Sequence, residues 1–397
     1  MAGGCLPSRT IAAFWRKKNN VLASLLCCYV FVFLVRQVNV NKLVAVENHI
    51  QITANNHQET FKPLKMILYW NSFFTSKDYT FGFGQQPFIN AKCPTTGCVT
   101  TDDRNLFNVS DVVIFSIQQL NLSDLPAHRF PHQRFVFYEM ESPSTTDPIP
   151  LLNNRTRFGF FNLTMTYRLD SDVVNRDAYG MVVPKGSLSS AYPKSRSNGT
   201  TSLNGNYSPV NINGKKKLAA WFVSNCVTTS RREDYVRELV KYVPVDIYGN
   251  CGNLTCENQT RGREMVRDDY KFYIGFENAL CTDYVTEKLM VGFFYDAVPV
   301  VRGAVNYAEF APPHSFIDVN DFASPKQLAD YLLLLNETDS LYARYFDWRR
   351  DYTVELYQKR GWCHLCQLAH DDQLPSKVYD DILTWWVDDP KNCDLPK

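Results

Sequence analysis

Three side chains with the chemistry to hold a nucleotide lie within one turn of a predicted helix: Tyr284, Glu287 and Lys288. A tyrosine ring can stack on a base or sugar, a carboxylate can accept hydrogen bonds from ribose hydroxyls, and an ammonium can bind phosphate. The start of a helix adds partial positive charge that favours an anion. An exposed glutamate and lysine on a surface helix is the commoner explanation of this pattern, so the spacing alone leaves both interpretations open.

A second cationic position occurs at the predicted start of an earlier helix. Ser230 and Glu233 have the spacing of a capping box, which predicts that this helix begins at about Arg231. Arg232 then lies on the inward side of the first turn, where an arginine suits a diphosphate, whereas Arg231 points to the flank. A solvated arginine pair explains the segment equally well. The predicted apolar stripe of this helix is formed by Val236, Leu239, Val240 and Val243.

Two glutamates end a buried strand in the first half of the chain. The run RFVFYEMESP places Glu139 and Glu141 just before Pro143, which breaks the strand pattern. Alternation along a strand puts both carboxylates on one side. A glutamate at a strand end that faces a cleft between domains can act as a general base on a substrate hydroxyl. Surface carboxylates are common, so the pattern by itself is weak evidence for a base.

An acidic triplet, Asp170-Ser171-Asp172, offers a different chemistry. Such a D-x-D pattern can bind a divalent cation that neutralises a diphosphate. Here it lies in the half of the chain away from the predicted cationic helix starts. We therefore favour a structural role for the triplet and predict no metal ligands.

The elements that must position these side chains follow an α/β pattern. After residue 217, strand, helix and strand alternate twice, which implies a parallel sheet. Short apolar runs in the first half indicate further buried strands. Ligands of parallel sheets bind outside the carboxyl ends of the strands, where Arg232 and Lys288 are expected. The predicted strands are 66–70, 112–115, 135–138, 218–223, 245–248, 272–276 and 298–301, and the predicted helices are 230–242 and 284–295, the latter with Asp283 as its N-cap and Val285, Leu289 and Phe293 facing the core.

Length and composition indicate two domains in the folded part. The chain has 397 residues, enough for two domains of ordinary size. Residues 186–217 are poor in large apolar residues and rich in Ser, Asn and Gly, so we place the boundary between the domains there. The 42 basic and 41 acidic side chains give a net charge of +1, which excludes a broad basic surface for nucleic acid. Any phosphate site is therefore local.

The N-terminal region indicates a membrane anchor. Residues 21–35 are apolar and uncharged, and the basic residues before them predict a cytosolic N-terminus. The run is short for an average bilayer but suits thin early-secretory membranes. A cleaved signal peptide is the alternative, although no clear cleavage site follows. We predict a cytosolic tail at 1–20, a signal anchor at 21–36 and a polar stem at 37–63, with all later residues lumenal.

Sequons and cysteines agree with a lumenal location. Nine cysteines follow the apolar run, an odd number, so one is unpaired or bonds another chain. The spacings of Cys93 with Cys98 and of Cys363 with Cys366 also occur in structural zinc sites, but in an oxidising lumen we favour disulfides. The candidate glycosylation sites all lie beyond the apolar run and are Asn108, Asn121, Asn154, Asn162, Asn198, Asn206, Asn253, Asn258 and Asn336.

Together these segments resemble the α-1,3-fucosyltransferases of glycosyltransferase family 10, which include the Lewis-type and the core N-glycan enzymes. The resemblance is carried by FYIGFENALCTDYVTEKL and by VPVVRGAVNYAEFAPPHSFIDVNDFASPKQLADYLLLL. The segments FVFYEMESP, TYRLDSD, VSNC with its downstream arginine, and FDWRRDY fit in the same order. The similarity spans roughly residues 64–368.

The resemblance implies a GT-B fold, in which two Rossmann-like domains face a cleft. The acceptor-binding domain would be 64–210 and the GDP-fucose-binding domain 211–355, with a tail at 356–397 that packs back on the first domain. The implied reaction is an inverting transfer of L-fucose from GDP-β-L-fucose to the 3-hydroxyl of N-acetylglucosamine.

Family roles carried to matching positions make Glu141 the base. Glu139 is the alternative, because bacterial members resemble this chain in having a second glutamate two positions earlier. The implied donor-binding residues, of which Arg232 and Lys288 contact the diphosphate, are Arg232, Asn278, Tyr284, Glu287 and Lys288.

The resemblance also implies which small molecules and partners the protein needs. GDP-fucose would be the donor, with no tightly bound cofactor and no required divalent metal, Mn being at most stimulatory. The partners would be the Golgi membrane and a glycan acceptor on glycoprotein or glycolipid, not nucleic acid, and the protein would be a single-pass type II Golgi protein. The pairs Cys93/Cys98 and Cys363/Cys366 resemble the family's disulfides that tie the C-terminal tail to the first domain, with the exact pairing open.

The acceptor and the enzymatic nature of the protein leave alternatives. Antenna N-acetylglucosamine, which gives Lewis-type products, and the innermost N-acetylglucosamine of N-glycans both fit these motifs. The alternative to an enzyme is a lumenal glycan-binding protein or a catalytically inactive relative of the same fold, and the presence of Glu141, Arg232 and Lys288 argues against it. A different GT-B glycosyltransferase is disfavoured by the family-specific residues around Glu287.

Overall fold

A computed structural model of the chain describes residues 63–186, 210–356, 358–388 and 393. The chain divides into two units, Met1–Pro63 and Leu64–Lys397. The predicted cytosolic tail and membrane anchor lie outside the described residues, as does the stem apart from residue 63. In the described ranges, no helix is both long and apolar enough to cross a membrane.

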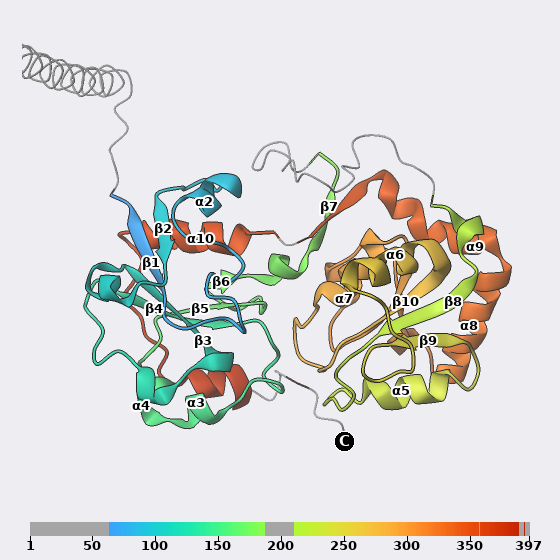
Figure 1. Cartoon of the computed structure of the whole chain (residues 1–397), viewed down its shortest axis with the longest axis horizontal. Helices are drawn as coiled ribbons and strands as arrows, with labels where there is room; N and C mark the ends of the chain where they lie inside the picture. Colours follow the sequence, from blue (N-terminus) through green and yellow to red (C-terminus); the bar gives the residue numbers. More distant parts are fainter. Residues whose placement is uncertain (1–62, 187–209, 357, 389–392, 394–397) are drawn as a thin grey trace, which may run out of the picture. The chain divides into compact units, whose positions relative to one another are not determined.

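The first half of the second unit is built on a parallel sheet with the strand order β2-β1-β3-β4-β5-β6 (Figure 1). Strands β3 and β4 are nearly continuous apolar runs, as expected where both faces of a sheet are covered, and every residue of β3 is buried. The predicted strands of this half are confirmed to within one residue at each end. The six strands are β1 Lys65–Tyr69, β2 Cys98–Thr101, β3 Val112–Ser116, β4 Arg134–Glu139, β5 Leu163–Thr166 and β6 Val173–Val174.

The later half forms a second parallel sheet with the order β12-β11-β10-β8-β9. This confirms the parallel sheet predicted from the alternation of strands and helices. The central strand β10 is buried along its whole length. The five strands are β8 Lys217–Phe222, β9 Val245–Tyr248, β10 Tyr270–Phe276, β11 Val298–Arg302 and β12 Ile317–Asp318.

Helices surround both sheets, and a separate pair of strands joins two distant parts of the chain. Strand β7 (Met181–Pro184) pairs antiparallel with β13 (Tyr352–Glu355). The α-helices are α2 Gln86–Asn90, α3 Ile149–Leu152, α4 Asn154–Arg157, α5 Arg232–Leu239, α6 Gln259–Asp269, α7 Glu287–Phe294, α8 Pro325–Glu337, α9 Asp339–Ala343 and α10 Arg360–Ala369.

Helix α5 differs from its prediction at both ends. The predicted capping box is wrong, because the Ser230 hydroxyl donates to the carbonyl of Glu277 and Glu233 instead accepts from the hydroxyl of Thr228. The helix therefore begins at Arg232 without a side-chain cap. Three of the four stripe residues are buried, but Val240 lies at the C-cap and is 39% exposed.

Helix α7 begins three residues later than predicted, at Glu287. Asp283 is not its N-cap: this residue has a positive φ of 61°, and its carboxylate accepts the backbone N–H of Leu169. Tyr284 consequently precedes the helix. The loop that carries Asp283 and Tyr284 continues to Thr286, whose backbone N–H donates to the carboxylate of Glu277.

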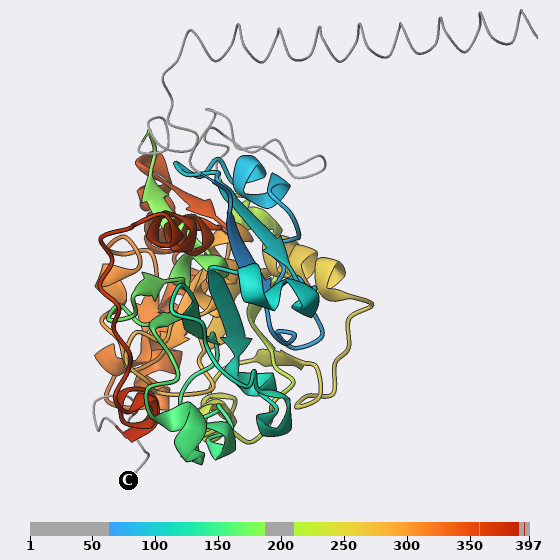
Figure 2. The same cartoon turned by 90° about the vertical axis from the view of Figure 1, so that its left-hand side faces the viewer.

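The C-terminal tail packs against the first sheet. Helix α10 lies beside that sheet in Figures 1 and 2, and its residues Trp362 and Leu365 belong to the same buried core. A short π-helix at Thr384–Asp388 contributes Trp386, which is fully buried in that core. Residues nearly 300 positions apart in sequence therefore share one hydrophobic interior.

Disulfides hold this tail covalently. Cys93 bonds Cys363 and Cys98 bonds Cys366, which confirms the disulfide interpretation of the two pairs and settles their connectivity. His370 lies close to Cys98 and Cys366, but both sulfurs are in the disulfide and the ring Nε2 contacts the carbonyl of Gly97 at 2.9 Å, so these residues leave no zinc ligand set. Two further disulfides of the described residues are Cys226–Cys251 and Cys281–Cys393, and the unpaired cysteine in this part of the chain is Cys256.

The candidate glycosylation sites divide by exposure. Asn162 is 2% exposed: its Oδ1 accepts the N–H of Phe135 and its Nδ2 donates to the carbonyl of Lys377, so a glycan there would break both bonds. Asn198 and Asn206 lie outside the described residues. The exposed candidates are Asn108, Asn121, Asn154, Asn253, Asn258 and Asn336.

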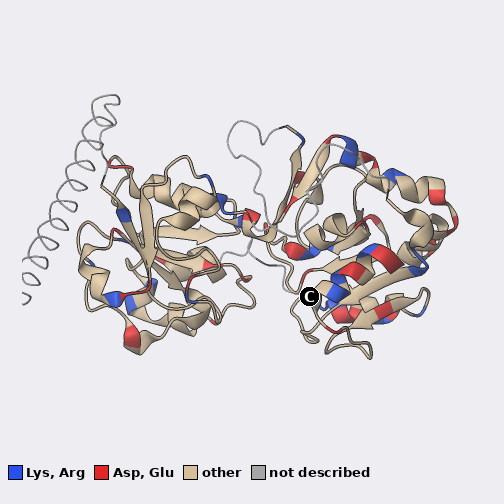
Figure 3. Cartoon of the chain, turned by 45° about the horizontal axis from the view of Figure 1, so that its top comes forward, with Lys and Arg blue, Asp and Glu red and all other residues tan. Residues whose placement is uncertain are grey.

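Charged side chains of both signs are interspersed along the described chain, as Figure 3 shows. On helix α5, for example, Asp234 pairs with Arg231 and with Arg237 at the surface. This pattern agrees with the near-zero net charge and leaves recognition of an anion to local groups.

Non-reducing peptide mapping should recover the cross-linked peptides Cys93–Cys363 and Cys98–Cys366, with alkylation of Cys256 before reduction. The double variant C98S/C366S should lower the free energy of unfolding by about 3 kcal/mol, because with Cys93–Cys363 intact the second bridge still closes a ring of about ten residues. The variant C256S is the matched control and should leave stability unchanged. Recovery of bound zinc with free thiols at these four positions would contradict the pairing.

Candidate active site

Polar side chains gather where the strands of the second sheet end. Strands β10 and β11 end in register at Phe276 and Arg302, and Glu277 follows β10 directly. Helices α5 and α7 both begin beside this edge, since Ser230 bonds the carbonyl of Glu277 and Thr286 bonds its carboxylate. The predicted placement of a binding site at the carboxyl ends of parallel strands therefore has a physical basis in these contacts.

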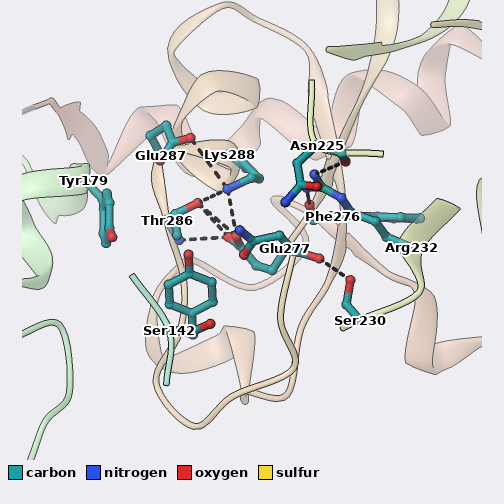
Figure 4. A network of polar contacts seen from close by, with 12 residues as sticks. Ser142, Tyr179, Asn225, Ser230, Arg232, Phe276, Glu277, Thr286, Glu287 and Lys288 are labelled. Carbon is teal, nitrogen blue, oxygen red and sulfur yellow. Dashed lines mark hydrogen bonds and ion pairs between the residues drawn. The ribbon is translucent and has the colours of Figure 1, made fainter. Parts of the chain in front are cut away.

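Glu277 is the centre of the polar network in Figure 4. Its side chain is 1% exposed and accepts the backbone N–H of Thr286 at 2.8 Å. The hydroxyl of Thr286 contacts both carboxylate oxygens, at 3.0 and 2.9 Å, and the Lys288 ammonium lies 3.0 Å from Oε2. Lys288 also donates to the Thr286 hydroxyl at 2.7 Å. The start of α7 is thus fixed by a buried carboxylate from the neighbouring strand.

The ion pair sets the charge of Lys288. Burial alone would lower the pKa of this ammonium, but Glu277 and Glu287 together raise it well above its ordinary value. Burial raises the pKa of Glu277 and Lys288 lowers it; with the ammonium at 3.0 Å, we regard the carboxylate as ionised. Lys288 keeps a side-chain exposure of 22% and therefore presents a permanent positive charge to solvent at the helix start.

Arg232 supplies a second fixed cation. Arg232 is 4% exposed, which agrees with the predicted inward position of its side chain. Its Nη1 and Nη2 donate to the carbonyls of Phe276 and Asn225 at 2.8 and 3.2 Å. Its Nε is buried without a hydrogen-bond partner in the described structure and lies 3.5 Å from the Glu233 carboxylate. In Figure 4 Glu277 lies between Lys288 and Arg232, so the end of β10 holds both cations.

Two neighbouring residues complete this edge. The backbone carbonyl of Asn278 accepts from Ser230, while its side-chain Oδ1 is buried without a partner among the described residues. Arg302 donates to the carbonyl of Ser230 at 2.6 Å, and burial lowers the pKa of its guanidinium. Both side chains border the loop that enters α5.

The two glutamates of the first sheet have different environments. Strand β4 ends at Glu139, so the predicted alternation does not extend to Glu141: the chain turns, and the N–H groups of Met140 and Glu141 both donate to Glu139 Oε1 at 2.8 Å. Glu139 is fully buried, which raises its pKa to about 8, and its Oε2 has no partner among the described residues. Glu139 therefore holds a turn rather than reaching outward.

Glu141 is partly exposed and lies against a residue from the second half of the chain. Its Oε2 accepts from the Tyr284 hydroxyl at 3.1 Å and contacts the Thr145 hydroxyl at 3.5 Å. Tyr284 is 1% exposed and belongs to the core of the first sheet. The predicted donor-binding tyrosine thus contacts the predicted base and precedes the helix that carries Glu287 and Lys288.

The acidic triplet is occupied by protein groups. Asp170 pairs with Arg168 at 2.5 Å. Asp172 accepts from the backbone of Thr164 at 2.8 Å and from the hydroxyl of Tyr379 at 2.9 Å, and it also pairs with Lys377. These contacts tie the loop after β5 to the C-terminal tail, which is a structural role.

The sequence interpretation missed Glu277, Thr286 and Arg302. Glu277 and Arg302 each stand at the end of a buried strand of the parallel sheet, so the rule that singled out Glu139 would also have found them. Thr286 carries no signal of its own, because its part depends on the carboxylate of another element.

Comparison with known proteins identifies the family of the chain. A model of the fucosyltransferase N-terminal region matches residues 62–179, and a model described as glycosyltransferase family 10 (fucosyltransferase), C-terminal, matches residues 212–385. The chain belongs to this family. It is 36% identical over 380 residues to alpha-(1,3)-fucosyltransferase C of Drosophila melanogaster, a match that covers 88% of this chain and 82% of the relative.

Two further matches define how far the similarity reaches. Glycoprotein 3-alpha-L-fucosyltransferase A of Drosophila melanogaster is 33% identical over 85% of this chain, which spans 64% of that longer relative. A crystal structure of an α1,3-fucosyltransferase with GDP-fucose has a TM-score of 0.53 and 17% identity and covers 82% of this chain and 95% of its own. The latter supports the α/β fold with parallel sheets.

Replacement of Glu277 by Gln should lower the free energy of unfolding by about 2 kcal/mol, because it leaves the Lys288 ammonium without its buried partner. Chemical denaturation measures this loss. Glu287→Gln is the matched control: its side chain is 42% exposed and 3.6 Å from the same ammonium, so it should cost less than about 0.5 kcal/mol. Equal losses in both variants would contradict the central place of Glu277.

Proposed function

We propose that this protein is an inverting α-1,3-fucosyltransferase that uses GDP-fucose as donor and the 3-hydroxyl of N-acetylglucosamine as acceptor. The observation that carries the proposal is the pair of fixed cations, Arg232 and Lys288, at the carboxyl edge of one sheet. The carboxylate of Glu141 is contacted by Tyr284, from the same chain segment as Lys288. Membership of family 10 supplies the class of reaction, and the relatives named above carry fucosyltransferase names.

The diphosphate of the donor suits the edge of the second sheet. Arg232 and Lys288 are held by protein acceptors before any ligand arrives, so little rearrangement is needed to meet an anion. Charge that develops on the departing GDP is stabilised by these cations and by the starts of α5 and α7. Glu287 and the unpartnered Oδ1 of Asn278 are the groups we assign to donor hydroxyl or base contacts. The family pattern also implies Tyr284 as a donor-binding residue, but its hydroxyl is bound to Glu141, so we assign it no donor contact.

We assign the base to Glu141. A general base must reach the acceptor hydroxyl, and Glu141 is partly exposed, whereas Glu139 is buried and its Oε1 is used by the turn. In the proposed step the Glu141 carboxylate takes the proton of the acceptor hydroxyl. The acceptor oxygen bonds the anomeric carbon of fucose, and the bond from that carbon to the β-phosphate oxygen of GDP breaks. The anomeric configuration inverts, and no step requires a metal.

We further propose that the protein is a single-pass type II protein of the Golgi membrane. The apolar run at 21–35 and the sequons after it support this topology. The four disulfides support folding in an oxidising compartment.

A fucosyl transfer assay tests the proposed function. The soluble fragment 64–397 is incubated with GDP-fucose and a panel that contains antenna N-acetylglucosamine and the innermost N-acetylglucosamine of N-glycans, followed by linkage analysis of the product. We expect an α-1,3 linkage to one of these sugars, and the active arm identifies the acceptor. Bound GDP with no turnover on either acceptor would favour a glycan-binding protein.

Glu141→Gln should lower kcat about a thousandfold, the usual contribution of a general base, with GDP-fucose affinity within twofold of the original. Lys288→Ala is its reciprocal control and should raise the Michaelis constant for GDP-fucose at least about tenfold, because a charge-assisted contact to phosphate is lost.

Glu139→Gln separates the two glutamates. The amide keeps an oxygen at the position that accepts the N–H groups of Met140 and Glu141, so activity should fall less than about tenfold. If Glu139→Gln is inactive while Glu141→Gln turns over, the base is Glu139.

A further inference from the structure

The loop between β10 and α7 belongs to two structural regions at once. It starts at the end of the second sheet, yet Ala279, Cys281 and Tyr284 are buried in the hydrophobic core of the first sheet. The carboxylate of Asp283 accepts the backbone N–H of Leu169 at 2.9 Å, which fixes the loop to the segment after β5. The loop is therefore held on both sides of Tyr284.

Tyr284 makes one polar contact and extensive apolar contacts. Its ring is 4.9 Å from the ring of Tyr167, and its hydroxyl donates to Glu141 Oε2 at 3.1 Å. Burial raises the pKa of Tyr284 well above its ordinary value, so the phenol keeps its proton near neutral pH. It can serve Glu141 only as a hydrogen-bond donor.

We propose that Tyr284 is a positioning residue for the base, and that its hydroxyl orients the Glu141 carboxylate from the segment that also starts the donor helix α7. The proposal rests on the function proposed above. Tyr284 donates to an oxygen of Glu141 that does not need to reach the acceptor, and no described residue donates to the other oxygen, Oε1. One oxygen is held and the other remains available.

Glu141 is constrained at two levels. Its backbone N–H is bound by Glu139, which fixes the turn. Its side chain has three rotatable bonds and would sample several orientations without the contact to Tyr284. Thr145 is a weaker second donor, because its hydroxyl lies 3.5 Å from Glu141 Oε2 and 3.0 Å from the carbonyl of Ser142. The tyrosine hydroxyl is therefore the principal contact that selects the carboxylate orientation.

The same segment connects the base to the cations. Tyr284 precedes Lys288 by four residues, and between them Thr286 is bound to Glu277 through its N–H and its hydroxyl. A displacement of the start of α7 therefore moves the tyrosine as well. This short path gives a physical reason for the base and the diphosphate site to keep a fixed geometry.

The test is Tyr284→Phe in the full-length enzyme, with Tyr167→Phe as the matched control. Both changes remove one hydroxyl from a buried ring, but the Tyr167 hydroxyl has no partner in the described structure. In Tyr284→Phe, the Glu141 carboxylate loses its principal hydrogen bond, so kcat should fall about tenfold, with the Michaelis constant for GDP-fucose within twofold. Tyr167→Phe should change none of these.

Other outcomes overturn the proposal in distinct ways. A rise confined to the Michaelis constant for GDP-fucose would make Tyr284 a nucleotide contact only. An unchanged kcat would show that the hydroxyl does not act on the base. Thermal unfolding of both variants checks folding, and failure of Tyr284→Phe alone to fold would reduce the contact to a structural one. Absence of transfer in the unsubstituted enzyme with GDP still bound concerns the proposed function, not Tyr284.

Discussion

The buried carboxylate of Glu277 is the constraint on which the proposed donor site depends. A carboxylate in the protein interior is stable only if it is paired and hydrogen-bonded, and Glu277 meets this requirement with Thr286 and Lys288. Because these partners are the last residue before α7 and a residue of its first turn, satisfying the carboxylate also fixes where the helix starts. The carbonyl of the same residue binds Ser230 ahead of α5. One residue at a strand end thereby positions two helix starts and, through them, two cations.

The first sheet also has a buried carboxyl group at the end of a strand, but this group is stabilised differently. Glu139 also ends a buried strand, but it has no cation, and its carboxyl is stabilised by two backbone N–H groups and by protonation, as its pKa of about 8 indicates. Two carboxylates in such proximity cannot both ionise without cost. A neutral Glu139 therefore avoids a second charge at this turn near neutral pH. The environments of the two residues, rather than their types, distinguish a carboxyl that holds a turn from the proposed base.

The extent to which the sequence predicted this structure depends on the range of the interactions involved. The strands and the parallel order of the second sheet followed from apolar runs and alternation, because burial on both faces requires such runs. The inward side of Arg232 followed from its distance to Val236 along one helix. Local rules failed where a partner is distant in sequence: Ser230 lies near Glu233 but bonds Glu277, and Asp283 bonds Leu169 rather than the helix that follows it.

The loop after β10 shows why such failures concentrate at a candidate site. By periodicity, Tyr284 belongs on the face of a helix with Glu287 and Lys288, and a continuous helix from 284 would present all three to one ligand. Instead the chain stays irregular until Thr286, because Asp283, Tyr284 and Cys281 are all bound to elements of the first sheet or the tail. Because of those contacts, the helix begins three residues later than predicted. The same short segment thereby supplies a hydroxyl to the proposed base and an ammonium to the proposed diphosphate position, a combination that an isolated helix start could not provide.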